Sequence, residues 1–203
     1  MKKRLQIIAG ILLLLASNVV VAQDAATKLV NTLSQSIKSH KNLVVSFTYQ
    51  ITGTTEAKEG KAYLQKEAYK IIMDEQESIS DGKVIWTYLK DEEEVIVSNA
   101  TEGKDDTPIQ LLTKLDKDYT AKLKGNDAKG NTLVELSNPK GDFESLTLIL
   151  DKKGELKGFE VDADEDNKLV FNIKEMLFDQ ELKEGFFTFD TKTHPNVDII
   201  DMR

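Results

Sequence analysis

The sequence predicts an α+β fold in which a curved, unclosed antiparallel sheet forms a half-barrel. Three observations lead to this fold class. Short runs of alternating apolar and polar residues recur between positions 43 and 189, separated by Gly, Asn and Asp clusters that favour turns. An amphipathic helical pattern precedes these runs, and a second one interrupts them after position 107. No linker-like composition divides residues 23–203, so we expect them to form a single domain.

The N-terminus has the pattern of a secretory signal peptide. Basic residues at 2–4 precede an apolar run at 7–16 that is too short to be a comfortable membrane span, and Val20-Val21-Ala22 fits a signal-peptidase site. We therefore expect a signal peptide over 1–22, cleavage after about Ala22 and a periplasmic protein; an uncleaved anchor is the alternative. The chain has no cysteine, which excludes disulfides, thiolate chemistry and a lipid anchor on a cysteine at the mature start.

The first elements are a helix and a pair of strands. Asp24 can cap a helix that runs to about His40. Its apolar residues recur at helical spacing on one face: Leu29, Val30, Leu33 and Ile37. The stretch from Leu43 to Ile51 alternates as a strand, 52–54 forms a turn, and 60–66 reads as a second strand that pairs with the first.

The stretch around 80–88 predicts a hairpin. Asp81-Gly82 tolerates the positive φ angles that a type I′ turn needs at both central positions. The strand that follows places Trp86 and Tyr88 on one face, and the strand before it alternates through 69–73. Glu94 to Val97 comes after a charged turn at 91–93 and completes an antiparallel meander. These aromatic and aliphatic side chains indicate a sheet curved round an apolar space.

A second helix and six further strands complete the predicted fold. Thr107-Pro108-Ile109-Gln110 combines a capping hydroxyl, a proline at the first helical position and a glutamine three residues after the cap. Leu111, Leu112 and Leu115 follow, so we expect a short amphipathic helix. The remaining strands are expected at 119–123, 132–137, 146–151, 156–162, 168–178 and 186–189.

The chain lacks the residues that an enzyme would need. His40 lies at a helix end, where an imidazole interacts with free carbonyls, and His194 precedes Pro195 in a loop. No nucleophile motif stands out. We therefore expect no catalysis and no cofactor.

Metal and nucleic-acid binding are also not expected. The acidic positions at 162, 164 and 166 resemble the start of a calcium loop, but Asn167 replaces the turn glycine and Ile173 stands where a bidentate glutamate is required. Loss of 1–22 would change the formal charge from −8 to −11, and no basic patch is visible for phosphate contacts.

Four short segments of this chain match, in their order and spacing, segments of a known protein family. They are Gly60 with Tyr63 and Leu64, Ile79-Ser80-Asp81-Gly82-Lys83 with Trp86 and Tyr88, Thr107-Pro108, and Phe187-Thr188-Phe189. In these segments the chain resembles the periplasmic outer-membrane lipoprotein carriers, the LolA-like family, over nearly all of residues 23–203. The resemblance implies an open barrel whose mouth is covered by helices.

The resemblance also implies a function and a set of site residues. A carrier of this family would bind the acyl chains of lipoproteins and ferry them from an inner-membrane releasing transporter to an outer-membrane acceptor, and we expect a monomer. The expected cargo-binding residues are Phe47, Tyr49, Tyr63, Leu64, Tyr69, Ile71, Met73, Ile79, Trp86 and Tyr88. The expected lid residues are Leu29, Leu33, Ile37, Leu111 and Leu112. Without the resemblance, the aromatic set would be interpreted as an ordinary filled core.

One family feature is changed in this chain. In the family an arginine at the end of the Gly60-type strand hydrogen-bonds the lid and holds it shut, and that position falls on Lys66. A lysine keeps the charge but loses the planar fork of donors. The alternatives to a lipoprotein carrier are a lipid-binding sensor or accessory protein of the same fold, a lipid hydrolase, and a scaffold module with a filled interior.

Overall fold

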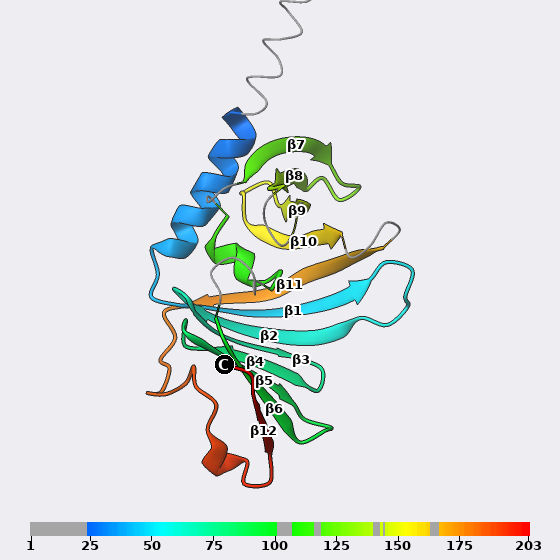
Figure 1. Ribbon diagram of the computed structural model, residues 1–203. Coiled ribbons are helices and arrows are strands. Elements are labelled where there is room, and N and C mark those ends of the chain that lie inside the picture. Colours follow the sequence, from blue (N-terminus) through cyan, green and yellow to red (C-terminus); the bar gives the residue numbers. More distant parts are fainter. Residues whose placement is uncertain (1–23, 101–106, 116–118, 140–142, 144, 163–166) are drawn as a thin grey trace, which may run out of the picture.

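A single curved sheet of twelve strands forms most of the molecule in the computed structural model (Figure 1). The structure describes residues 24–100, 107–115, 119–139, 143, 145–162 and 167–203. The predicted signal peptide and its cleavage site lie outside these residues, as do Asp164 and Asp166 of the calcium-like loop. Within the described part, no helix is both long enough and apolar enough to span a membrane.

The helices and strands follow in this order. A helix covers residues 24–38. The strands and short 3₁₀ helices are β1 (Leu43–Ile51), β2 (Lys58–Gln65), β3 (Ala68–Met73), β4 (Gln76–Ser80), β5 (Val84–Leu89), β6 (Glu94–Asn99), η1 (Gln110–Thr113), β7 (Thr120–Asn126), β8 (Thr132–Ser137), β9 (Ser145–Leu150), β10 (Leu156–Asp162), β11 (Lys168–Phe178), η2 (Thr191–Thr193) and β12 (Asp198–Asp201).

The strand order shows that the sheet does not close. It runs β12-β6-β5-β4-β3-β2-β1-β11-β10-β9-β8-β7, so β12 and β7 are the two edges. Two antiparallel meanders, β1 to β6 and β7 to β11, are joined where β1 pairs with β11. Every neighbouring pair is antiparallel except β12 with β6. The predicted fold class, an open and mostly antiparallel half-barrel, is confirmed.

Two predicted elements differ from the structure. Residues 186–189 were expected to form a strand, but they lie in two successive turns, in which the N–H groups of Phe186 and Thr188 bond to carbonyls three residues earlier. The last strand is instead β12. The second helix is a single 3₁₀ turn, η1, although Gln110 Oε1 does accept a hydrogen bond from the N–H of Thr107, as a glutamine three residues after a cap should.

The predicted hairpin at Asp81-Gly82 exists, but its turn is not type I′. Of the two residues only Gly82 has a positive φ, at +89°. Ser80 pairs with Ile85, so the loop is longer than two residues, and Asp81 Oδ1 accepts hydrogen bonds from the N–H groups of Lys83 and Val84. A carboxylate that bonds to the backbone two residues on stabilises such a loop without a second positive φ.

The helix and η1 fill the concave side of the sheet (Figure 1). The helix buries one stripe, made by Ala26, Val30, Leu33 and Ile37. The segment around η1 buries Ile109, Leu111, Leu112 and Leu115, each at most 4% exposed. These side chains share one apolar cluster with the inner faces of β1 to β3 and β7 to β11. We call the helix and residues 107–115 the cover. All five predicted lid residues lie in it.

Candidate binding site

Six of the ten predicted cargo-binding residues share the concave face of the sheet. Register establishes this, because directly opposite residues of neighbouring strands point to the same side. Phe47 lies opposite Gly60, which lies opposite Met73, and Leu64 lies opposite Tyr69. The six residues on this face are Phe47, Tyr49, Leu64, Tyr69, Ile71 and Met73.

The other four predicted residues lie on the convex face. Tyr63 cannot share a side with Leu64, because consecutive strand residues point to opposite faces. Trp86 lies opposite Ile79, and Ile79 lies opposite Lys70, which alternates with the inward-facing Tyr69 and Ile71. Tyr88 follows the same alternation as Trp86. The expectation that Trp86 and Tyr88 face the same space as the β3 residues is therefore wrong.

The C-terminal segment packs against two of these side chains, Tyr63 and Tyr88. Residues 179–197 run along the sheet on the side away from the helix (Figure 1). The ring of Phe186 packs edge-on against Tyr63 at 4.8 Å, and Phe189 lies 5.3 Å from Tyr88. His194 stacks on Phe189 at 4.8 Å. The convex aromatic residues thus support a second, smaller packing layer rather than the concave site.

Gly60 has a specific packing role on the concave face. A Cβ atom placed on it would lie 2.4 Å from the ring of Phe47, which is closer than any real contact. The bare backbone of β2 therefore lets the Phe47 ring lie across it. The centre of that ring lies 5.5 Å from the ring centre of Phe171, and Phe171 stacks on Phe159 with 4.5 Å between ring centres. The centre of the concave side is consequently solid.

The open space lies at the margins of the cover. A cavity of about 500 Å³ opens over the inner faces of β3 to β5. Its apolar part is formed by Tyr49, Ile71, Met73 and Leu89, while Gln76, Ser78 and the turns at 74–75 and 90–92 make the rim polar.

The hydroxyl of Tyr49 is neutral at this rim. Burial and a hydrogen bond to Asp74 raise the pKa of Tyr49 to about 12. The hydroxyl therefore donates to the Asp74 carboxylate, which also pairs with Lys58.

Two further cavities flank the helix. One of about 540 Å³ separates it from β10 and β11, where Leu33, Ile173, Met176 and Phe178 contribute apolar walls. The other, of about 290 Å³, lies between the end of the helix, the β2–β3 turn and η1. Ile37 lines both. Each volume is comparable with about 300–1,000 Å³ for small-molecule sites.

The predicted latch residue, Lys66, lies on the rim of the 290 Å³ cavity. It occupies the two-residue turn between β2 and β3 with a φ of +53°. Residues from the helix and from η1 line the same cavity, so Lys66 faces both parts of the cover. No hydrogen bond or ion pair joins its ammonium group to another residue in the described ranges.

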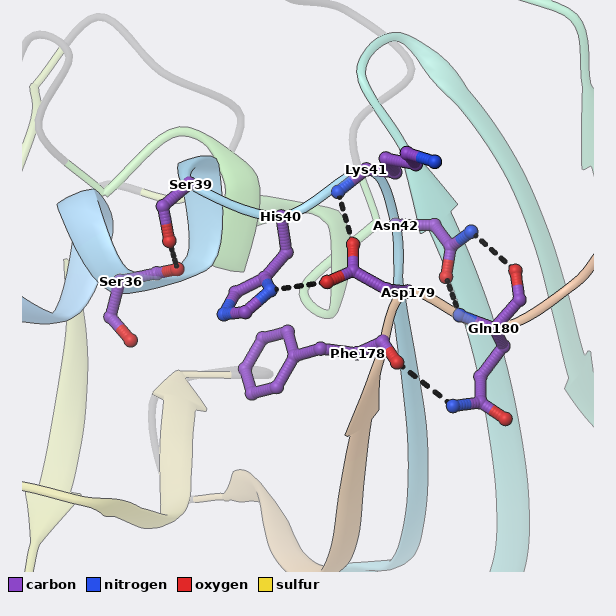
Figure 2. A network of polar contacts seen from close by, with 8 residues as sticks. All are labelled: Ser36, Ser39, His40, Lys41, Asn42, Phe178, Asp179 and Gln180. Carbon is purple, nitrogen blue, oxygen red and sulfur yellow. Dashed lines mark hydrogen bonds and ion pairs between the residues drawn. The ribbon is translucent and has the colours of Figure 1, made fainter.

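A different set of contacts fastens the helix to the sheet (Figure 2). Asp179, just after β11, accepts hydrogen bonds from His40 Nδ1 and from the N–H of Lys41, both at 2.7 Å. The two partners hold the pKa of the Asp179 carboxyl below its ordinary value, the His40 bond contributing most. The amide of Asn42 donates to the carbonyl of Gln180 and accepts from its N–H, each at 2.9 Å. We call these contacts the clamp.

Both histidines pack against aromatic rings. The His40 ring stacks on Phe178 at 4.2 Å within the clamp, and His194 belongs to the convex aromatic layer. Among the described residues, no group of three or more His, Asp or Glu is placed to hold a metal ion.

Comparisons with known proteins give the chain a family. The family model described as outer membrane lipoprotein carrier protein LolA matches residues 55–190. An outer-membrane lipoprotein carrier protein of Shewanella sp. (strain MR-4) is 31% identical over 165 residues, 73% of this chain and 79% of that protein. One from Histophilus somni (strain 2336) is 25% identical over 197 residues, 93% of each.

A solved structure shares the fold. An uncharacterized conserved protein from Thermus thermophilus superposes with a TM-score of 0.56 at 11% identity, over 87% of this chain and 99% of that one. The family model spans more than half of the chain. The resemblance seen in the sequence is thus confirmed, and the chain belongs to the outer membrane lipoprotein carrier protein LolA family.

Proposed function

We propose that this protein is a periplasmic carrier that binds the acyl chains of lipoproteins on its concave face and ferries them from the inner to the outer membrane. Its partners in this proposal are an inner-membrane releasing transporter and an outer-membrane acceptor. The protein acts as a monomer without covalent chemistry. The observation that carries the proposal is an apolar concave face that is closed by separate segments, rather than by the sheet itself, in a member of this family.

The energetics favour exchange between cover and cargo. An acyl chain gains about 0.8 kcal/mol for each CH₂ group that leaves water. The cover buries its leucine and isoleucine side chains against the same face, so a bound chain replaces contacts that the empty protein makes with itself. The three cavities lie where the cover meets the sheet, and we propose that acyl chains enter there. Displacement of the cover lowers the net affinity, which makes later release possible.

The site residues in this proposal are the six on the concave face. Lys66 remains a candidate for controlling the cover, because it borders the cavity that the helix and η1 share. The four convex residues are not part of the site.

Cargo analysis tests the proposal. The protein is purified from its native envelope without detergent, and mass spectrometry identifies whatever acylated material accompanies it. Purified protein is then titrated with a fluorescent acyl probe and with a synthetic triacylated lipopeptide as competitor. We expect stoichiometric probe binding that the lipopeptide displaces. Absence of any binding would instead support a scaffold with a filled interior, and recovery of free lipid without lipopeptide competition would support the sensor or accessory function.

A further inference from the structure

The two ends of the concave face differ in charge. The turns at 74–75 and 90–92 lie at one end, where the rim of the 500 Å³ cavity carries one lysine, Lys90, and four acids: Asp74, Glu75, Asp91 and Glu92. The β2–β3 and β4–β5 turns lie at the other end, since strands alternate in direction, and a Cβ on Gly82 would lie 3.1 Å from Glu67. The 290 Å³ cavity opens at this second end.

Basic side chains surround that second cavity. Those lining it are Lys38, Lys41, Lys66 and Lys114, and His40 lies among them. Among the described lining residues, Glu67 is the only acid. The C-terminus of the helix adds about half a negative charge, which offsets the lysines only in part. Asp179, which bonds to His40 and to the N–H of Lys41, is a second acid at this rim, so four lysines stand against two carboxylates in a chain whose formal net charge is −8. We call this cavity and its lysines the basic pocket.

The floor of the basic pocket is apolar. Ile37, Leu43 and Leu64 line it, and each is at most 5% exposed. Leu43 and Leu64 lie opposite one another on the concave face, so the floor continues into the proposed acyl site. A positive rim above an apolar floor matches an amphiphile with an anionic head and a hydrocarbon tail.

The clamp holds part of this rim in place. His40 and Lys41 are fastened to Asp179, and Asn42, which is only 8% exposed, forms a paired amide contact with Gln180 (Figure 2). The short connection between the helix and β1 is therefore ordered before any ligand arrives. A preorganised site loses less conformational freedom on binding.

From this placement we propose that the basic pocket binds the phosphate head of an anionic acyl lipid, whose chain lies along the concave face. The acyl part of this inference rests on the proposed function, and the head-group preference goes beyond it. Lys66, whose position in the family is associated with holding the lid, binds the phosphate head in this proposal. The acidic end, by contrast, repels the same head group, so the lipid binds in one orientation.

Matched amphiphiles test the inference. Dodecyl phosphate and dodecyltrimethylammonium have the same chain and opposite charge, and each displaces a fluorescent acyl probe below its micelle concentration. We expect the phosphate to bind about tenfold more tightly, which corresponds to about 1.4 kcal/mol, and the preference to shrink at high salt. Inorganic phosphate alone is expected not to displace the probe, and displacement would overturn the assignment to an amphiphile.

Charge-reversal variants locate the effect. The double variant Lys41→Glu/Lys66→Glu is expected to remove or invert the preference. Lys129→Glu/Lys152→Glu, in turns of the other half of the sheet, has the same net charge and should keep the preference. The inference would be overturned if the wild type bound both amphiphiles equally, or if the control variant lost the phosphate preference as fully as Lys41→Glu/Lys66→Glu does. Either result would leave the proposed acyl site intact. Failure of every acyl probe to bind would refute the proposed function itself.

Discussion

Adjacent residues on β3 provide a sharp test of which face binds acyl chains. Met73 lines the 500 Å³ cavity on the concave face, whereas Ile72 points to the convex face opposite Glu77. Both side chains are half-buried. Met73→Glu and Ile72→Glu therefore introduce the same charge, one residue apart, on opposite sides of the same strand.

The expected size of the effect follows from burial. A fully buried methionine contributes about 1.5–3 kcal/mol, so the half-buried Met73 offers a bound chain about 1 kcal/mol. A carboxylate against hydrocarbon without a hydrogen-bond partner costs at least about 2 kcal/mol more. Together these give about 3 kcal/mol, or a Kd for an acyl probe that rises about 150-fold in Met73→Glu. Ile72→Glu should change that Kd less than about threefold.

Fluorescence titration of the two variants measures the effect, and thermal unfolding shows whether each remains folded. The reasoning would be refuted if Ile72→Glu weakened binding as much as Met73→Glu, or if Met73→Glu bound the probe like the wild type. Trp86→Phe is a further control on the convex face, and its binding should also equal that of the wild type.

Three other predictions concern packing and charge. Gly60→Ala should lower the free energy of unfolding by about 1–3 kcal/mol, because the new methyl group displaces the ring of Phe47, and denaturant unfolding would measure this loss. The ultraviolet titration of the tyrosines should include one step near pH 12 that is absent from Tyr49→Phe. Because folding raises the pKa of Tyr49, its contribution to the stability of the fold is complete below about pH 10 and is lost as the pH rises through about 12. Folding lowers the pKa of Asp179, mainly through the hydrogen bond with His40. The stability difference between wild type and Asp179→Asn should therefore be constant above about pH 5 and shrink as the pH falls below about 4. A stability difference that grew in acid would contradict the clamp.

The pattern of alternation predicted most strands but not the face of each one. Residues 132–137, 156–162 and 168–178 form strands at the predicted bounds. Trp86 and Tyr88 were assigned to the wrong face because β4 was not recognised as a separate strand. The two-residue turn at Asp74-Glu75 joins Met73 to Gln76, so the inward positions change from odd to even numbers. Ser80 then pairs with Ile85, so the inward positions return to odd numbers in β5, and counting both changes would have placed Trp86 on the convex side.

The packing of the C-terminal segment depends on contacts distant in sequence. Phe187 and Phe189 are two residues apart, as in a strand, but Phe186 and Phe189 find aromatic partners in Tyr63 and Tyr88 on the convex face of β2 and β5. Turns that aim these rings at the sheet therefore replace a strand. The parallel position of β12 likewise depends on the edge of β6, which no local pattern reveals.

The clamp and the basic pocket were also not predicted from the sequence. Asp179 meets His40 across most of the length of the chain, and the lysines of the pocket come from the end of the helix, the connection that follows it, the β2–β3 turn and the residue after η1. Of the seven predicted residues on β1 to β3, six are neighbours on one face because their partners are sequential strands, whereas Tyr63 lies on the other face.

Photocrosslinking of a bound acyl chain addresses the main proposal most directly. A diazirine placed along the chain of a lipopeptide labels whatever side chains it touches, and mass spectrometry maps the modified residues. Labelling at Leu64, Ile71 and Met73, with Ile37 or Leu112 of the displaced cover, is the result that we predict. Labelling confined to the convex residues Ile72, Trp86 and Tyr88, or spread evenly over the surface, would contradict it.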